Sequence, residues 1–409
     1  MKRILFLLVV LILISSCDKK DDGDYEDYLV ARPLKVSIEE FKNGVDVVSP
    51  LPINESGKIY AYKDYIFIND KYKGVHVIDN RVPSSPQKIA FIKIAGNVDI
   101  SIKDDYLYAD SLMDLIVLDV SDINNISIVS RMENVLRDNV IWPAQADFFE
   151  SGEIDYATEV LVGWELVTER RLKSEYEGRF VDFAFAEATN DASVGQGGSL
   201  ARFKIVNDYL YAVDSHNINI FDISDMENPK DLEDVYAGFD IETIFNRGEQ
   251  LFLGSMRGMY IYDISTPASP TLISEFQHGT ACDPVVVDGD YAFVTLRGGN
   301  ACGATESGLF IIDISDITAP QLEISYSMDE PYGLGVKDEK LFVCDGASGL
   351  KIFDKTDVNS LKPLNHFKDI IAFDVIPLEE NLLMVGDDIL YQYAYLENDI
   401  RLISTLRLN

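Results

Sequence analysis

The sequence predicts an all-β protein built from seven copies of one unit. The unit is marked by an apolar strand that ends at an Asp, as in residues 115–122 (LIVLDVSD), 218–225 (INIFDISD) and 309–316 (LFIIDISD). The motif Asp stands at positions 79, 119, 222, 263, 313 and 354, and Ala394 takes its place in a seventh copy. The steps between copies are 40, 103, 41, 50, 41 and 40 residues. The period is therefore near 40 residues, with two insertions.

Each copy has room for four strands. An aromatic and β-branched segment such as residues 209–212 (YLYA) precedes the motif, and another short apolar segment precedes that one. A Pro or Asn turn and one more strand usually follow. This pattern is typical of a β-propeller blade, and a closed ring of blades buries the faces that one blade cannot. We therefore predict a seven-bladed β-propeller with four-stranded blades over residues 45–409. Its repeats fall near residues 56–96, 97–134, 199–238, 239–279, 280–330, 331–370 and 371–409.

The motifs quoted above resemble the LVIVD repeats of bacterial surface β-propellers. The resemblance covers residues 56–409 and implies the fold. It implies no particular activity, because propellers host many functions.

The N-terminal residues have the pattern of a targeting signal. Lys2 and Arg3 precede an unbroken apolar run over residues 4–14, which is too short to span a bilayer but suits a secretory signal. The run leads to Cys17 through two serines, which resembles a bacterial lipobox. The resemblance implies that residues 1–16 are removed and that Cys17 carries diacylglycerol and a fatty acyl chain such as palmitate. The alternative is an ordinary signal peptide with a chance cysteine.

The segment after Cys17 is acidic and lacks apolar periodicity, so we expect residues 17–44 to hold the lipidated Cys and a solvated tether. Its first residues, a Lys and several acids, resemble the surface-export signal of lipoproteins in Bacteroidetes-type bacteria. The resemblance implies an outer-membrane lipoprotein that faces the cell exterior. The alternative is a plain acidic spacer. Residues 45–53 are predicted to form a strand that completes the last blade.

The motif Asp is predicted to be structural. Placed at a strand end, its carboxylate can accept hydrogen bonds from backbone N–H groups two or three residues later. The alternative is an array of calcium sites, but the ligand spacing of a calcium loop is absent.

Strand polarity assigns the two insertions, residues 135–198 and 298–307, to one side of the ring. This upper face carries the turn before the first strand of each blade and the turn between its second and third strands. Loops on a rigid scaffold commonly carry function, so we expect the long insertion to pack over the upper mouth near blades two and three. Cys282 and Cys302 also fall on this face and are predicted to form a disulfide. Cys344 is expected to be a buried thiol.

Several side chains are candidates for a ligand or partner site on the upper face. The insertion holds both tryptophans, Trp142 and Trp164, which could bind a partner or form the insertion's own core. His278 is the best-placed titratable base, with a solvated loop histidine as the alternative. Charged residues start the first strands at the channel mouth and form either a ligand site or a solvated rim; they are Asp99, Asp240, Asp283, Asp374, Lys58 and Arg202.

Composition narrows the function further. With 35 Lys and Arg against 69 Asp and Glu, the net charge is −34, which disfavours binding to nucleic acid. Recognised catalytic, metal-ligand and cofactor motifs are absent from the sequence. We therefore expect a lipid-anchored cell-surface module that binds or scaffolds a protein or glycan partner, with no metal and no cofactor. One alternative is a propeller-type hydrolase or lyase acting on carbohydrate, which would gather groups with displaced pKa values in an upper-face pocket. The other is a structural subunit held by a membrane partner.

Overall fold

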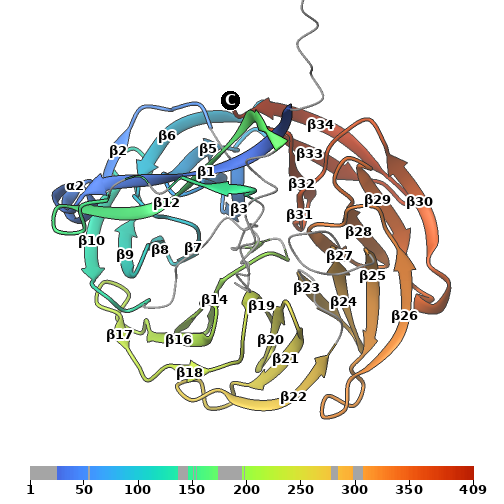
Figure 1. Ribbon diagram of the computed structural model, residues 1–409. Coiled ribbons are helices and arrows are strands. Elements are labelled where there is room, and N and C mark those ends of the chain that lie inside the picture. Colours follow the sequence, from blue (N-terminus) through green and yellow to red (C-terminus); the bar gives the residue numbers. More distant parts are fainter. Residues whose placement is uncertain are drawn as a thin grey trace, which may run out of the picture.

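The structure is a computed structural model in which β-sheets are arranged around a common centre (Figure 1). It describes residues 25–53, 56–136, 146–150, 152, 154–173, 196–197, 199–277, 284–297 and 307–409.

Five of the sheets in the described chain have four antiparallel strands, each paired with its neighbour in sequence order. The first of them holds β7 (Ile100–Lys103), β8 (Tyr106–Ser111), β9 (Asp114–Asp119) and β10 (Ser127–Met132). The second holds β19 (Ile241–Arg247), β20 (Gln250–Ser255), β21 (Gly258–Asp263) and β22 (Thr271–Gln277). The third holds β23 (Val285–Asp288), β24 (Tyr291–Leu296), β25 (Gly308–Asp313) and β26 (Gln321–Ser327). The fourth holds β27 (Leu334–Lys337), β28 (Lys340–Cys344), β29 (Leu350–Asp354) and β30 (Lys362–Phe367). The fifth holds β31 (Asp374–Pro377), β32 (Asn381–Gly386), β33 (Ile389–Tyr395) and β34 (Ile400–Arg407).

Three sheets depart from this plan. The six-stranded sheet holds β3 (Ser56–Tyr62), β4 (Tyr65–Asp70), β5 (Gly74–Asp79) and β6 (Gln87–Lys93), extended by β13 (Gln196–Gly197) and β2 (Asp46–Val48). In the five-stranded sheet the fourth strand is broken in two: β14 (Phe203–Val206), β15 (Tyr209–Val213), β16 (Asn217–Asp222), β17 (Lys230–Asp231) and β18 (Val235–Tyr236). A three-stranded sheet joins β11 (Phe148–Phe149), β1 (Tyr25–Ser37) and β12 (Glu159–Leu172).

Adjacent sheets pack face to face through apolar side chains that point from both sides of each strand. The second strand of each four-stranded sheet is buried except at its first residue. One cluster joins the last sheet to the first through Ile376, Leu383 and Ile59. Ile53 and Leu408 belong to the same cluster, and the Ile53 N–H donates to the Leu408 carbonyl at 2.9 Å. The two ends of the repeat array therefore pack against each other.

A repeated hydroxyl contact also links neighbouring sheets. Ser130 on β10 and Ser274 on β22 each donate to a carbonyl in the turn after the third strand of the next sheet, at 2.8 Å to Glu227 and 2.6 Å to Ile317. Ser404 on β34 makes the matching contact to Pro83 of the first sheet at 2.6 Å. The last sheet thus contacts the first in the same way that consecutive sheets contact one another.

Two expectations for the N-terminal part are wrong. Strand β2 does not complete the last sheet, because it pairs with β6 at the outer edge of the first sheet, and the last sheet has its own fourth strand, β34. Nor is the segment up to residue 44 a tether throughout. Residues from Tyr25 onward form the long strand β1, followed by helix α2 (Ile38–Asn43), which begins at an N-cap where Ser37 Oγ accepts from the Glu40 N–H. β1 is a strand because it pairs with β12. Its partner lies far along the chain, so the sequence around β1 does not show the pairing.

The six motif aspartates make the predicted turns. Each carboxylate accepts a hydrogen bond from the backbone N–H two residues later, at 2.7–3.0 Å. At Asp119, hydrogen bonding from the Ser121 side chain and then from its backbone N–H holds the pKa of the carboxyl below its usual value. The Asp side chain therefore ends the third strand and starts the turn to the fourth, as the sequence predicts.

Replacing Asp119 by Ala should lower the free energy of unfolding by about 1 kcal/mol, because the Ser121 N–H loses its acceptor. Asp119→Asn keeps an acceptor oxygen and should lose less. Because the folded pKa lies below the unfolded one, the contribution of the charge is present at neutral pH and is lost as the pH falls through the folded pKa. Urea unfolding of the three proteins should show the gap between parent and Asp119→Asn closing in acid. A gap that is independent of pH would contradict this account.

Candidate functional site

The three-stranded sheet covers part of the upper face. β1 pairs with β12 along their whole length, and Leu34 of β1 packs on Tyr72 and Val98, which lie in upper-face turns of the first two repeats. A Cβ at Gly163 would come within 2.1 Å of the Tyr72 ring, so only glycine lets β12 approach this closely. Figure 1 shows β1 and β12 in front of the sheets that begin with β3 and β7. The long described strand of the insertion, β12, therefore lies over blades one and two, which agrees with the expected place at blade two only.

Trp164 belongs to the core of this cover. Its side chain is only 7 % exposed, and its ring meets the edge of Phe149 with centroids 5.7 Å apart. Of the two roles considered for the insertion's tryptophans, the structure assigns Trp164 to packing.

The end of the insertion enters the centre of the molecule. β13 pairs with the innermost strand β3, with Gln196 opposite Ala61 and Gly197 opposite Tyr60. Two residues later, Ser199 Oγ accepts from the Leu334 N–H at 2.8 Å, on the innermost strand of a different sheet. The chain then reaches β14. The central space is thus crossed by the protein's own backbone at this level.

Asp99 joins the innermost strands of the first three repeats. One carboxylate oxygen accepts from its neighbour's N–H, that of Ile100, at 2.7 Å. The other accepts from the Arg202 N–H at 2.7 Å, the Phe203 N–H at 3.1 Å and the Lys58 ammonium at 3.1 Å. All of these groups are buried. Asp99 is therefore a structural junction across the long insertion and not an open ligand site.

The two cations beside Asp99 are strongly desolvated. Lys58 is 4 % exposed, and burial lowers the pKa of its ammonium despite the opposing effect of Asp99. Arg202 is 5 % exposed, and its Nε and Nη1 atoms have no hydrogen-bond partner in the structure. The cluster depends on Asp99, because a buried cation without its carboxylate is costly.

The remaining channel-mouth acids do not converge with Asp99 into a single ring. Asp374 is 1 % exposed and accepts from the Val375 N–H at 2.9 Å, where it lies against Gly333. Asp240 lies in the turn before the fourth repeat, where its side chain is 10 % exposed and lies beside Arg257. Asp283 falls outside the described residues.

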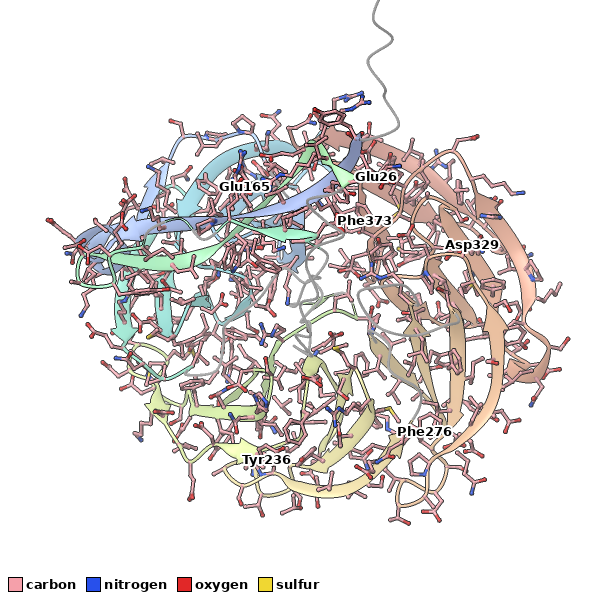
Figure 2. The ribbon with its side chains drawn as sticks, viewed as in Figure 1. Glu26, Glu165, Tyr236, Phe276, Asp329 and Phe373 are labelled. Carbon is pink, nitrogen blue, oxygen red and sulfur yellow. The ribbon has the colours of Figure 1, made fainter. Side chains whose placement is uncertain are left out.

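Asp240 belongs to an exposed aromatic cluster that the sequence analysis did not identify. Tyr236 and Phe239 are 58 % and 49 % exposed, and their rings meet edge to face with centroids 6.0 Å apart. His216 approaches Phe239 from another side at 5.6 Å, and the Arg257 guanidinium lies over the Phe239 ring at 5.1 Å. We call these four residues, together with Asp240, the aromatic patch. Figure 2 shows Tyr236 on the opposite side of the ring from Glu165 of β12.

The backbone of the patch is held on both sides. The Ala237 N–H donates to the His216 carbonyl at 2.7 Å, and the Met256 N–H donates to the Asp240 carbonyl at 3.1 Å. Asp240 has a φ of 61°, in the left-handed region. At Gly238, with φ 141°, a Cβ would also approach the Tyr260 ring to 3.1 Å. The exposed rings therefore stand on a loop of fixed conformation.

The carboxylate of Asp240 is partly desolvated. Burial raises its pKa, and the nearby Arg257 and His216 partly offset this effect. The Arg257 Nε lies 3.5 Å from an Asp240 oxygen. The patch thus presents an acceptor and a donor side by side, next to two apolar rings.

A signal for this patch does exist in the sequence. At the matching place in the fourth strand, the fourth and fifth repeats have the polar residues Gln277 and Ser327, opposite Gly258 and Gly308. The third repeat has Tyr236, opposite Asn217, followed closely by Phe239. Two aromatics where other repeats are polar indicate a local departure from the structural pattern.

Six of the predicted site residues lie outside the described residues, and the disulfide and lipidation stay predictions; they are Cys17, Trp142, His278, Cys282, Asp283 and Cys302. Cys344 is fully buried at the end of β28. In the parts of the chain that the structure describes, no three His, Cys, Asp or Glu side chains are placed to hold a metal ion. Helices there are short, and none has the length and hydropathy to cross a bilayer.

Comparisons with known proteins agree with the repeat pattern. The LVIVD repeat family matches residues 95–133, 250–277 and 278–328, so the chain carries LVIVD repeats. No curated protein matches it.

Solved structures share the fold at low identity. The computationally designed protein Ika8 is similar with a TM-score of 0.52 at 10 % identity, over 90 % of this chain and 91 % of that one. BamB from Moraxella catarrhalis has a TM-score of 0.50 at 9 % identity, over 90 % and 99 %. Hsv2 from Kluyveromyces lactis has 0.50 at 11 %, over 87 % and 100 %. These likenesses show a propeller-like fold and nothing about activity.

Asp99→Asn should be strongly destabilising. The neutral amide leaves the buried Lys58 ammonium without its carboxylate and weakens the acceptor of the Arg202 backbone N–H, which typically costs about 3–5 kcal/mol of unfolding free energy. The double variant Lys58→Met, Asp99→Asn also removes the ammonium that pairs with Asp99 and should be more stable than the single variant. Urea unfolding measures both. A loss below about 1 kcal/mol in the single variant would show that the junction is not important for stability.

Proposed function

We propose that this protein is a closed seven-bladed β-propeller that acts as a lipid-anchored binding or scaffold module at the outer surface of the cell. The LVIVD repeats and the propeller-like fold support the closed ring. So do the matching Ser404–Pro83 contact and the apolar cluster between the last and first sheets. The binding role takes a protein or a glycan as partner on the upper face.

The observation that carries the binding role is the aromatic patch. Exposed aromatic rings on a fixed loop are typical of recognition sites, because little conformational entropy is lost when a partner covers them. The tryptophan of the insertion does not compete for this role, since Trp164 is buried under Phe149. In the described chain, Lys58 and Asp99 form a saturated structural pair and do not face an open pocket.

The proposed anchor has a geometric consequence. Strand β1 begins at Tyr25, only eight residues after Cys17. An extended residue spans about 3.3–3.6 Å, so the linker can hold the folded domain no more than roughly 30 Å from the lipid. The domain would therefore stay close to the membrane surface.

Changing Cys17 to Ser should release the protein from the membrane fraction, because the lipid is its proposed attachment. Fractionation and mass spectrometry of the parent and variant measure this. Added protease should also clip the parent on intact cells. If parent and variant fractionate alike with no acyl group on either, the anchor is wrong; protection of the parent until lysis would place it on the inner side of the membrane.

A photo-crosslinking amino acid at position 236 should yield a covalent adduct with the partner on living cells. The matched control is position 402, on the outer strand β34, where Leu402 is 50 % exposed against 58 % for Tyr236. An adduct at 236 without one at 402 supports a binding site on the upper face. Adducts at neither position, or only at 402, would contradict it.

A further inference from the structure

Resting on the binding function proposed above, we infer that the aromatic patch is a binding site for a neutral saccharide. The face of an aromatic ring is negative, and it attracts the weakly positive C–H groups that a sugar ring presents on its flatter side. Tyr236 is the most exposed ring of the patch, and Phe239 stands edge to face with it. The two rings form a corner in which one sugar ring can stack on Tyr236.

An acceptor and a donor lie next to the two rings, since Arg257 lies over Phe239 and beside Asp240. The Asp240 carboxylate accepts hydrogen bonds, and the Arg257 guanidinium beside it donates them, with Nε 3.5 Å from the carboxylate. Their separation is longer than a good hydrogen bond, so both retain capacity for vicinal hydroxyls of a ligand. Asp240 is also partly desolvated, as its raised pKa indicates, which strengthens hydrogen bonds to it.

Charge excludes the main competing small ligands. A cation cannot occupy the face of Phe239, because the Arg257 guanidinium already lies there at 5.1 Å, and that positive charge also repels a second cation at the neighbouring Tyr236 ring. An anion would approach a protein with a net charge of −34 and would meet Asp240. Because Asp240 and Arg257 balance each other, the patch favours a neutral ligand.

The apolar area is too small for a stable protein interface. Such interfaces take about 800 Å² from each partner. Two aromatic rings that are about half exposed offer on the order of 200 Å². That area matches one or two sugar rings, and the fixed backbone at Ala237 and Asp240 presents it without rearrangement.

The test is isothermal titration of the purified protein with neutral hexasaccharides: cellohexaose, maltohexaose, laminarihexaose, xylohexaose and mannohexaose. At least one should bind the parent. Tyr236→Ala should weaken that binding about five- to tenfold through loss of stacking. Asp240→Asn, which tolerates the left-handed backbone, should weaken it about tenfold. The control Tyr156→Ala removes a tyrosine that is 73 % exposed outside the patch and should bind like the parent.

Urea unfolding midpoints equal to the parent's show that the variants are folded. The inference is overturned if no neutral hexasaccharide binds, if binding survives Tyr236→Ala, or if only anionic polygalacturonate binds. If crosslinking at position 236 succeeds while every hexasaccharide fails, the binding function stands and the saccharide does not. If crosslinking and titration both fail, the binding function fails as well.

Discussion

The carboxylate of Asp99 is the interaction on which the arrangement of the first three repeats depends. The second and third repeats are separated by the long insertion, so chain connectivity alone does not keep them adjacent. Asp99 replaces that connection by accepting hydrogen bonds from the first residues of the third repeat, Arg202 and Phe203, and from Lys58 of the first. Asp110 in turn orders Asp99, since its carboxylate accepts from the Asp99 N–H at 2.8 Å. Because these groups are buried, water cannot replace a lost partner, and the loss of any one hydrogen bond lowers the free energy of unfolding.

The insertion then determines which part of the upper face is available. Its strand β12 forms a sheet with the N-terminal strand β1 over the first two repeats, and its end passes through the centre between β3 and β27. One side of the upper face and the central space are thus occupied by the protein itself. The aromatic patch lies on the other side, away from the cover (Figure 2). The described part of the insertion therefore limits where on the upper face a partner can bind.

The sequence predicts the contacts between residues that are close together in the chain, and it does not predict the contacts between distant residues. The turns at Asp119 and its equivalents follow from the motif, because donor and acceptor are two residues apart. The pairing of β1 with β12 joins Tyr25 to Leu172, and no local pattern marks such a contact, so residues 25–44 resemble a tether. Likewise, a short strand such as β2 can pair at the edge of either terminal sheet, and its sequence does not choose between them. At the candidate site, the position of Asp240 before β19 marks it as a candidate in the sequence. Its contact with Arg257 and the nearby exposed rings of Tyr236 and Phe239 are visible only in the structure.

The patch lies where the third repeat differs from the fourth and fifth repeats in its fourth strand. In the fourth and fifth repeats, the fourth strand is continuous up to Gln277 and Ser327, with one bulge on the way. Such bulges twist an outer strand and limit pairing with other chains. In the third repeat the strand is interrupted between β17 and β18, and only two residues, Val235 and Tyr236, pair again at the upper edge. The chain then turns at Gly238, which leaves Tyr236 and Phe239 exposed above the sheet. The fourth and fifth repeats hold a polar residue at the matching place, so the exposed rings of the third repeat coincide with its interrupted fourth strand.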